Sequence, residues 1–213
     1  MDRIQIINLL ATKNNLNKYL EIGLRNPWEC FDQIICEYKD SVDPGIETDN
    51  NMAKYKFTSD TFFNLLENSS LDIPSNFKWD IIFIDGLHTA DQVEKDINNS
   101  LNHLSDNGYL IIHDCNPPTE YHARSNYYDY STSAAGCWNG SVWKAIYKLR
   151  CTREDLDISV VDCDWGCGII KRGLQSLCEF TNNFYDFDKF EKDKKSHLNL
   201  ITTDEFLNII NKS

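Results

Sequence analysis

The stretch WDIIFIDGLHTADQVEKDINNSLNHLSDNGYLIIHDCN, residues 79–116, decides the fold. It contains two Ile-rich runs, 81–84 and 109–112, with the length and composition of strands buried on both faces. Polar residues with carboxylate and imidazole groups follow the ends of these runs: Asp85, His88, His113 and Asp114. Because open parallel sheets bind ligands at the carboxyl ends of their strands, we expect these four side chains to gather at one crevice.

The segment between the two runs has the pattern of an amphipathic helix. Apolar side chains recur there at helical intervals, at Val93, Ile97, Leu101 and Leu104. Thr89 and Gln92 have the spacing of a capping box, and Asn107-Gly108 is a turn signal before the second run. The stretch therefore predicts a strand, a helix and a second strand.

Comparable signals on both sides predict an alternating α/β chain. Helices are expected at 2–11, from Pro27 to about Cys36, from a cap at Asp60 to about 67, at 142–150, and near 204–211 with Thr202 and Glu205 as a capping box. Further strands are expected at 18–22, 40–43, 55–58, 158–162 and 168–171, the last two as an antiparallel hairpin. This order predicts a doubly wound sheet.

The chain divides into two parts near residue 173. Residues 1–173 are predicted to form one domain with a short leading helix and an aromatic, irregular lid loop over 117–140. Residues 174–213 form a polar and aromatic tail with one helix. We expect this tail to pack on the domain or on a partner subunit, as in a homodimer.

Composition restricts the partners. A chain of 213 residues with 41% hydrophobic residues can bury one ordinary core. Its net charge of -12 argues against nucleic-acid or anionic-membrane surfaces and favours a small-molecule or neutral glycan partner. The start has no apolar run of secretory length, and nowhere do 18 apolar residues follow one another, so we expect a cytoplasmic protein. The eight cysteines are expected to be reduced, because most of them lie in or beside predicted core segments of a chain without an export signal. No CxxC pair is present to indicate zinc.

Five motifs together resemble the class I S-adenosylmethionine-dependent methyltransferases, above all the small O-methyltransferase-like branch found beside glycan and natural-product pathways. They are YLEIG (19–23), SVDPG (41–45), TSDTFF (58–63), FIDGLH (83–88) and LIIHD (110–114). The resemblance covers roughly residues 18–171. It implies a Rossmann-like, mostly parallel seven-stranded sheet whose last strand is antiparallel, with S-adenosylmethionine across the carboxyl ends of the first strands.

The motifs supply a candidate cofactor site. Gly23 would let the backbone approach a ligand, and Glu21 would offer it a carboxylate; alternatively, they are a helix-entry glycine and a solvated acid. Asp43, 20 residues after Gly23, has the spacing of an acid that accepts both ribose hydroxyls, although an Asp before Pro-Gly is also an ordinary turn residue. Ser59 and Asp60 either border the adenine or cap a helix. Asp85 and Gly86 complete the set that the resemblance implies.

The loop after the first strand, EIGLRNPWEC, contains only one glycine. Pyrophosphate binding needs a glycine-rich approach to a helix N-terminus, so this loop argues against a nicotinamide dehydrogenase. S-Adenosylmethionine has no phosphate and tolerates the difference better.

The resemblance to metal-dependent O-methyltransferases implies a divalent ion such as Mg²⁺ held by Asp85 and Asp114. Cys115 stands where the third ligand belongs, although Mg²⁺ prefers oxygen. His88 follows Asp85 by three residues, where those enzymes carry a lysine base, so His88 is the candidate general base. The alternative is that His88 bonds a backbone carbonyl. If the strand alternation continues, one of His113 and Asp114 points away from the crevice, and we expect it to be His113.

The sequence therefore predicts methyl transfer to a hydroxyl of a small molecule or sugar, with His88, Asp85 and Asp114 as catalytic residues. A second reading is an inactive methyltransferase-fold binding or scaffold module, supported by the glycine-poor loop and Cys115. N-Methylation is less favoured, although Asn116-Pro117-Pro118 is similar to a motif of amino-group methyltransferases. There the motif follows the fourth strand and ends in an aromatic residue, whereas here it follows the fifth and ends in Thr119.

Overall fold

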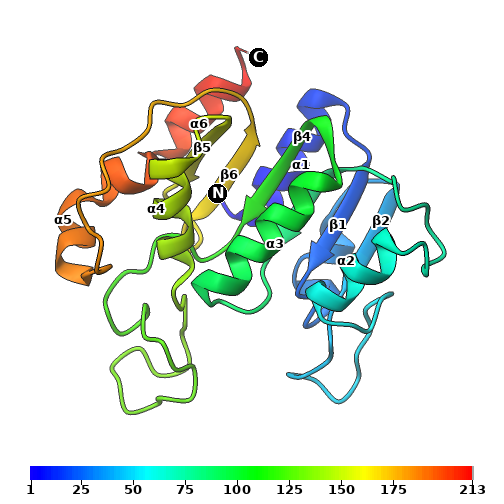
Figure 1. Ribbon diagram of the computed structural model, residues 1–213, viewed down its shortest axis with the longest axis horizontal. Coiled ribbons are helices and arrows are strands. Elements are labelled where there is room, and N and C mark those ends of the chain that lie inside the picture. The colour runs from blue at the N-terminus through cyan, green and yellow to red at the C-terminus, as the bar shows by residue number, and fades with distance from the viewer. Residues whose placement is uncertain (213) are drawn as a thin grey trace.

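The computed structural model describes residues 1–212 and contains a seven-stranded mixed sheet (Figure 1). In sheet order the strands are β2 (Tyr38–Val42), β1 (Lys18–Ile22), β3 (Trp79–Ile84), β4 (Leu104–Ile112), β6 (Cys167–Arg172), β5 (Leu156–Val161) and β7 (Leu200–Ile201). β6 is antiparallel to both of its neighbours, and the other pairs are parallel. The predicted doubly wound, mostly parallel sheet is confirmed.

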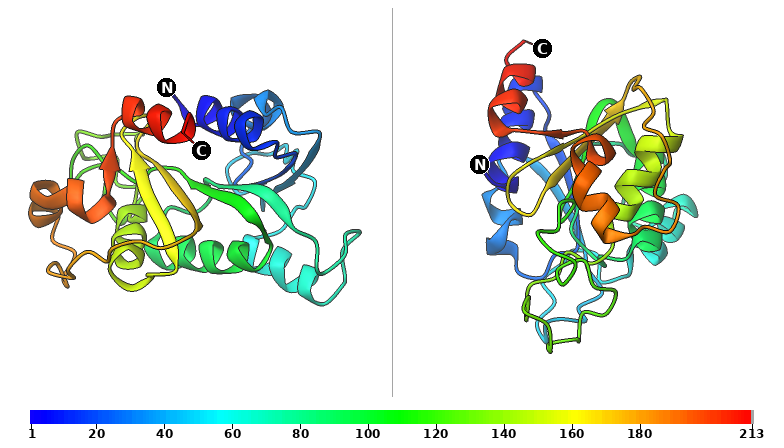
Figure 2. Two further views of the ribbon diagram at one scale, coloured as in Figure 1. Left: turned by 90° about the horizontal axis from the view of Figure 1, so that it is seen from above. Right: turned by 90° about the vertical axis from the view of Figure 1, so that its left-hand side faces the viewer.

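Helices cover both faces of the sheet, as the view from above shows (Figure 2). One face packs against α2 (Ser59–Glu67), α3 (Ala90–Asn102), α4 (Val142–Thr152) and α5 (Phe187–Leu198). The other face packs against α1 (Arg3–Asn14) and α6 (Thr203–Ile210). The Ile-rich runs alternate between these two cores: Ile82 and Ile84 face the first, and Ile81 and Phe83 face the second. Burial on both faces is the reason why the runs 81–84 and 109–112 contain no charged residue.

Strand register brings three chain segments to one edge. Ile22 at the end of β1 is paired with Ile84 at the end of β3, and Ile84 with Ile112 at the end of β4. The residues that follow these three isoleucines therefore leave the sheet side by side. Two long loops, 43–58 and 117–140, project beyond the same edge (Figure 1). The second is irregular, as expected, and Arg124 donates hydrogen bonds to four carbonyl groups within it, those of Tyr121, Tyr127, Ala135 and Cys137.

The segments after β1 and β2 differ from the sequence prediction. Instead of a helix from Pro27 to Cys36, there are two 3-10 turns, η1 (Pro27–Glu29) and η2 (Phe31–Gln33), because the backbone of Cys30 between them is not helical. The strand expected at 55–58 is a single bridge between Tyr55 and Val42. α2 begins directly afterwards, and its cap is Thr58, which accepts a hydrogen bond from the N–H group of Thr61, rather than Asp60.

Two local sequence signals in the strand–helix–strand stretch also have other structural roles than predicted. Thr89 caps α3 by its backbone position only, and the Ala90 N–H donates to Ser141 Oγ at 2.7 Å, so no capping box forms. Asn107-Gly108 is no turn but lies inside β4. A Cβ on Gly108 would lie 2.7 Å from the Asp80 carbonyl oxygen, which shows that this glycine allows a close strand approach.

The tail contributes to the sheet and to its core. β7 pairs with β5 at the sheet edge and supplies the seventh strand, whereas α5 was not predicted from the sequence. Phe190 and Leu198 of α5 lie in the main core. α6 carries the predicted capping box of Thr202 and Glu205. All eight cysteines are free, as expected. Within residues 1–212, no helix has both the length and the apolar character needed to cross a membrane.

Candidate active site at the carboxyl edge of β3 and β4

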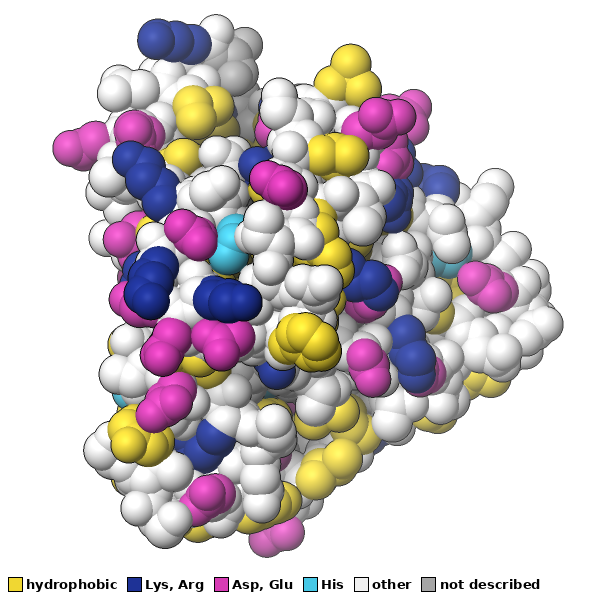
Figure 3. Space-filling view, turned by 60° about the vertical axis from the view of Figure 1, so that its left-hand side comes forward, with side chains coloured by type: hydrophobic (Ala, Val, Ile, Leu, Met, Phe, Trp, Pro, Cys, Tyr) yellow, Lys and Arg dark blue, Asp and Glu magenta, His cyan; other side chains and the backbone are white. Residues whose placement is uncertain are grey.

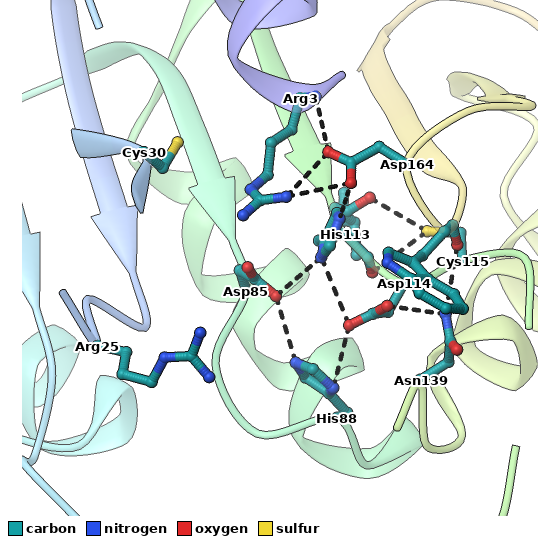
Figure 4. Close-up of polar contacts among 12 residues, drawn as sticks. Arg3, Arg25, Cys30, Asp85, His88, His113, Asp114, Cys115, Asn139 and Asp164 are labelled. Carbon is teal, nitrogen blue, oxygen red and sulfur yellow. Dashed lines mark hydrogen bonds and ion pairs between the residues drawn. The ribbon is translucent and has the colours of Figure 1, made fainter. Parts of the chain in front are cut away.

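The four residues singled out after β3 and β4 form one contiguous cluster (Figure 4). Asp85 Oδ1 lies 3.3 Å from His88 Nε2 and 3.2 Å from His113 Nδ1. Asp114 Oδ2 lies 3.2 Å from His88 Nδ1 and 3.4 Å from His113 Nδ1. Each acid thus contacts both imidazoles. The expected gathering of these four side chains is confirmed.

His113 does not point away from this cluster, as strand alternation suggested. β4 ends at Ile112, and Asp114 adopts a left-handed backbone with φ of 62°. The alternation of side chains holds only for extended backbone, so His113 and Asp114 can both turn inward. His113 is 7% exposed and lies between the two acids, whereas Asp114 points in as expected.

His88 is held by the end of the 117–140 loop. Its Nδ1–H group donates a hydrogen bond of 2.9 Å to the Trp138 carbonyl oxygen, and its ring stacks on the Trp138 ring with centroids 5.1 Å apart. The Ser141 N–H in turn donates to the His88 carbonyl oxygen at 2.8 Å. Since the Trp138 carbonyl can only accept, Nδ1 carries a proton, and only Nε2 can exchange a proton with a ligand.

Three further residues, which the sequence did not indicate, contact the cluster (Figure 4). Asp164, in the turn between β5 and β6, has Oδ1 3.5 Å from His113 Nε2. Arg3 of α1 binds Asp164 through its backbone N–H at 2.9 Å and its guanidinium at 2.9 and 3.2 Å. Asn139 donates to Asp114 Oδ1 at 2.7 Å. Asp164 lies in the Asp164-Trp165-Gly166 turn, whose three residues have positive φ, and no sequence pattern connects this turn to the cluster.

The acids and the imidazoles of the cluster stabilise one another's charged forms. Burial lowers the pKa of His88, but the hydrogen bond to Asp85 and the charges of Asp114 and Asp85 outweigh it and raise this pKa to about 9. Burial also lowers the pKa of His113, and Asp85, Asp114 and Asp164 raise it well above its usual value. Both imidazoles are therefore cations at neutral pH. They hold the pKa of Asp85 well below its usual value despite burial.

The cofactor candidate Glu21 is buried in β1. Its Oε2 accepts a hydrogen bond of 2.6 Å from the Tyr19 hydroxyl, which also contacts Cys30 Sγ at 3.8 Å. Burial raises the pKa of Glu21 to about 7, partly offset by the Tyr19 hydrogen bond and reinforced by the charge of Asp85. Glu21 is thus 3% exposed and is not a solvated acid.

Gly23 is required by a neighbouring loop of the protein itself. Its φ is 97°, and a Cβ there would lie 2.2 Å from the Asp85 carbonyl oxygen. The turns after β1 and β3 therefore touch at this glycine. Gly86 has no such restriction, because a Cβ there would meet ordinary contacts with Ile22 at 3.7 Å or more.

The remaining cofactor candidates line the loops beside this edge. Asp43 Oδ1 accepts a hydrogen bond of 2.6 Å from the Gly45 N–H, which is the turn role considered above, and burial raises the pKa of Asp43. Within residues 1–212, Asp43 Oδ2 has no hydrogen-bond partner. Ser59 Oγ and Asp60 Oδ1 both accept from Gln92 Nε2, at 3.2 and 2.9 Å. These two residues connect α2 to α3.

Three donor groups are arranged so that they could hold a metal ion. One atom each of Asp85, His113 and Asp114 lies within 4.8 Å of the others. Cys115 is not among them, because its Sγ is buried and donates to the Ile112 carbonyl oxygen at 3.3 Å. Asn116 donates its amide N–H to Asp162 Oδ1 at 2.9 Å. The third member of this group is therefore His113 and not Cys115, the position that the resemblance implied.

Comparison with known proteins gives a family match over part of the chain. A family model described as a methyltransferase domain matches residues 26–115, which include Asp43, Ser59, Asp60, Asp85, His88 and Asp114. The match reaches from η1 to the residue after Asp114 and so contains the carboxyl edge of β3 and β4. No curated protein sequence matches the chain.

Two solved structures have a similar fold. One is an O-methyltransferase from Bacillus cereus in complex with S-adenosylhomocysteine (SAH), 12% identical, covering 80% of both chains with a TM-score of 0.52. The other is an SAH-bound methyltransferase from Podospora anserina, 14% identical, covering 81% of this chain and 80% of that chain, also with a TM-score of 0.52. At these identities the likeness establishes a shared fold.

Proposed function

We propose that this chain, which carries a methyltransferase domain on the class I methyltransferase fold, transfers the methyl group of S-adenosylmethionine to a hydroxyl of a small molecule or sugar. The observation that supports this proposal most directly is the cluster of Asp85, His88, His113 and Asp114. It lies at the carboxyl edge of β3 and β4, where open α/β sheets bind their ligands. Both similar structures contain SAH, the product of such a reaction.

The cofactor would lie across the ends of β1, β2 and β3, beside the cluster. Asp43 fits a ribose, because Oδ1 is fixed by Gly45 while Oδ2 remains free to accept hydroxyl hydrogen bonds. Ser59 and Asp60 at the start of α2 would border the adenine, and Glu21, Gly23 and Gly86 would shape the floor of the site. None of these residues is cationic. A site without cationic side chains is suitable for a cofactor that has no phosphate group.

His88 would act as the general base through Nε2. The acceptor oxygen attacks the sulfonium methyl group in line, its O–H proton passes to His88, and SAH leaves as the C–S bond breaks. Trp138 fixes the ring so that Nε2 is the atom that takes the proton. Because Asp85 and Asp114 raise the pKa of His88, this role requires that their negative charge be offset when the substrate binds.

A divalent ion such as Mg²⁺, when bound, would offset that charge and polarise the acceptor hydroxyl. Asp85 and Asp114 would hold it, and both present a carboxylate oxygen to the same space. In either case, the two carboxylates would orient the acceptor, directly or through the ion.

Calorimetry tests the cofactor step. SAM and SAH are titrated into the full chain, each with and without Mg²⁺, and we expect saturable heat with both. Asp43→Asn, which keeps the Gly45 hydrogen bond but weakens ribose recognition, should reduce the affinity at least about tenfold, as expected for one lost charge-assisted hydrogen bond. Binding of neither compound under any condition would contradict the proposal.

The base is tested separately by His88→Ala, measured with any acceptor that a panel of phenols, hydroxylated natural products and sugars yields. We expect kcat to fall about 10²–10⁴-fold, the range for loss of a general base, with loss of the corresponding step in the pH profile. An unchanged kcat and pH profile would show that His88 is not the base.

A catalytically inactive binding or scaffold module is the second candidate. The observation that favours it is the first loop, where Arg25 is paired with Glu29 at 2.8 Å and two 3-10 turns replace a helix N-terminus. Saturable SAM binding without turnover on any acceptor of the panel would support this module. N-Methylation of nucleic acid is disfavoured, because basic and acidic side chains are interspersed on the face in Figure 3 and no continuous cationic patch appears there.

A further inference from the structure

Asn139 connects the 117–140 loop to the cluster, and the proposed catalytic roles do not use it (Figure 4). This residue is 1% exposed, and its Nδ2 donates a hydrogen bond of 2.7 Å to Asp114 Oδ1. The same nitrogen donates a longer bond of 3.4 Å to the Trp165 carbonyl oxygen, in the turn between β5 and β6. An amide nitrogen has two hydrogen atoms, so both acceptors can be served at once. Asn139 therefore joins the loop, the segment after β4 and the turn after β5 at one point.

The residue after Asn139 is packed directly against His88. Gly140 has a φ of 61°, and a Cβ there would lie 2.1 Å from the His88 carbonyl oxygen. A glycine is therefore needed for the loop to come this close to His88. The N–H groups of Asn139 and Gly140 both donate to the His122 carbonyl oxygen, at 3.0 and 3.1 Å, which joins the two ends of the loop. Docking of the loop thus fixes His88 and Asp114 at the same time.

Bonds between its own residues hold the 117–140 loop together. Arg124 donates to four carbonyl groups of the loop, and its own carbonyl oxygen accepts a hydrogen bond of 2.7 Å from Trp138 Nε1. From outside the loop, the Trp165 ring packs on the His122 ring with centroids 5.5 Å apart. Because the internal bonds do not involve the cluster, the loop can leave the cluster as one body if its attachments are weakened.

We propose that Asn139 is a positioning residue for Asp114, and that its side-chain hydrogen bonds keep the 117–140 loop docked on the cluster in the arrangement that methyl transfer requires. When the loop is undocked, Asp114 loses its amide partner, and His88 loses the Trp138 carbonyl oxygen that orients its ring. The acceptor hydroxyl then meets a base and a carboxylate that are no longer held at fixed positions.

Cofactor binding should not depend on this docking. The cofactor candidate Asp43 follows β2, and Ser59 and Asp60 begin α2, so these residues belong to other chain segments than the loop. The effect of Asn139 on turnover rests on the proposed function. Docking itself is measured without turnover, so that failure of methyl transfer and failure of this inference are distinguishable.

The first experiment measures hydrogen exchange of the full chain by mass spectrometry, without cofactor or acceptor. The N–H groups of residues 139–141, which are hydrogen-bonded in the docked loop, report on docking. Asn139→Ala should increase their exchange rate at least about tenfold, as expected when one hydrogen bond to a charged group is lost. Asn126→Ala is the matched control and should leave this rate unchanged, because Asn126 is exposed in the same loop and accepts from the Tyr128 N–H. An unchanged rate in Asn139→Ala would overturn the proposal.

Two glycine variants test the same contact by steric exclusion. Gly140→Ala should increase the exchange of residues 139–141, because the added Cβ cannot lie beside the His88 carbonyl oxygen. Gly136→Ala is its control, since a Cβ at that position has no atom of residues 1–212 within 4 Å. Equal exchange in the two variants would contradict the docked arrangement of the loop.

A double variant tests the hydrogen bond itself. Asn139→Asp alone brings two carboxylates together and should increase exchange more than Asn139→Ala does. Asn139→Asp combined with Asp114→Asn exchanges donor and acceptor, so that part of the protection should return. A double variant that exchanges as fast as Asn139→Asp would show that this bond does not hold the loop. Circular dichroism checks that each variant is folded, and the glycine pair still decides the question if an Asn139 variant is not.

The last experiment uses an acceptor from the panel described above. Asn139→Ala should lower kcat about 10–100-fold, because the base and the carboxylate are misplaced, and should leave the Kd for SAM within about twofold of the wild-type value. Asn126→Ala should change neither quantity. A purely structural role for Asn139 would weaken SAM binding and lower kcat together, and that result, or an unchanged kcat, would overturn the assignment.

Discussion

At the scale of single residues, Glu21 is an acid that the fold keeps partly protonated at neutral pH. It is buried in β1, accepts a hydrogen bond from Tyr19, and has a pKa raised to about 7 by burial. The pKa of a glutamate in the unfolded chain is about 4.5. The folded state therefore retains this proton over a pH range in which the unfolded state has lost it.

This difference predicts how stability depends on pH. Below about pH 4.5 both states are protonated, and between about 4.5 and 7 the free energy of unfolding falls as pH rises, by a total of about 3 kcal/mol for Glu21. Glu21→Gln keeps an acceptor for Tyr19 and cannot ionise, so its stability relative to the wild type should increase from pH 5 to pH 8. Urea unfolding at both pH values measures this, and a difference that is independent of pH would contradict the assignment.

Residues near one another in the sequence could be predicted to form the cluster, whereas distant ones could not. The four side chains after the Ile-rich runs gather because strand register aligns Ile84 with Ile112. The predicted orientation of His113 was wrong, because the alternation of side chains was extended beyond the end of the strand. There the backbone of Asp114 is in the left-handed conformation. The positions of Arg3 and Asp164 in the cluster could not be predicted, because both are far away in the sequence. Arg3 precedes Asp85 by 82 residues, and Asp164 follows His113 by 51 residues.

At the scale of elements, the turns after β1 and β3 are packed so closely that one position excludes a side chain. A Cβ on Gly23 would clash with the Asp85 carbonyl oxygen at 2.2 Å, and its φ of 97° adds backbone strain. The contact holds the backbone of Asp85 in place. It therefore connects the geometry of the first loop to that of the cluster.

Gly23→Ala should destabilise the protein by at least about 2 kcal/mol, more than the left-handed backbone alone costs, because a neighbouring strand end must move. Gly86→Ala is the matched control, since its Cβ meets ordinary contacts, and it should change stability by less than about 1 kcal/mol. Denaturant unfolding compares the two. Similar losses from both variants would show that the close approach at Gly23 is not specific.

Elements with strong hydrophobic patterns were predicted correctly, whereas short elements were predicted poorly. β3, β4 and α3 have long apolar runs or stripes, and their existence could be predicted because burial dominates their energetics. The segment 27–36 carries a helix-start proline but places Cys30, Ile34 and Cys36 in the same core as α1. In one helix Cys36 would not share the face of Cys30 and Ile34, because it lies six residues after Cys30. The bridge at Tyr55 is too short for any periodicity to reveal.

At the scale of the whole molecule, the tail is joined to the domain through its core and sheet. Phe190 stacks against Trp143 of α4 with ring centroids 4.2 Å apart, and β7 extends the sheet beside β5. The contribution of α5 to the core was not predicted, because most of its residues are charged and only a few of them are buried. A tail of this kind behaves as part of the folded unit.

Phe190→Ala should therefore reduce the free energy of unfolding by about 3–5 kcal/mol, the range for a buried phenylalanine. Phe184→Ala, in the same tail but 91% exposed, should have little effect and is the matched control. Thermal unfolding with one transition that shifts only for Phe190→Ala would support a single cooperative unit. Equal effects would indicate that the tail does not share the core.

The contact between Arg3 and Asp164 joins positions 161 residues apart in the chain. Contacts of such long sequence separation close the largest loops and depend on the intervening strands being in place. The first helix and the final hairpin must both dock before Asp164 is held beside His113. Ligand binding at this edge should consequently be one of the last properties that the chain acquires as it folds, after the sheet that supports it has assembled.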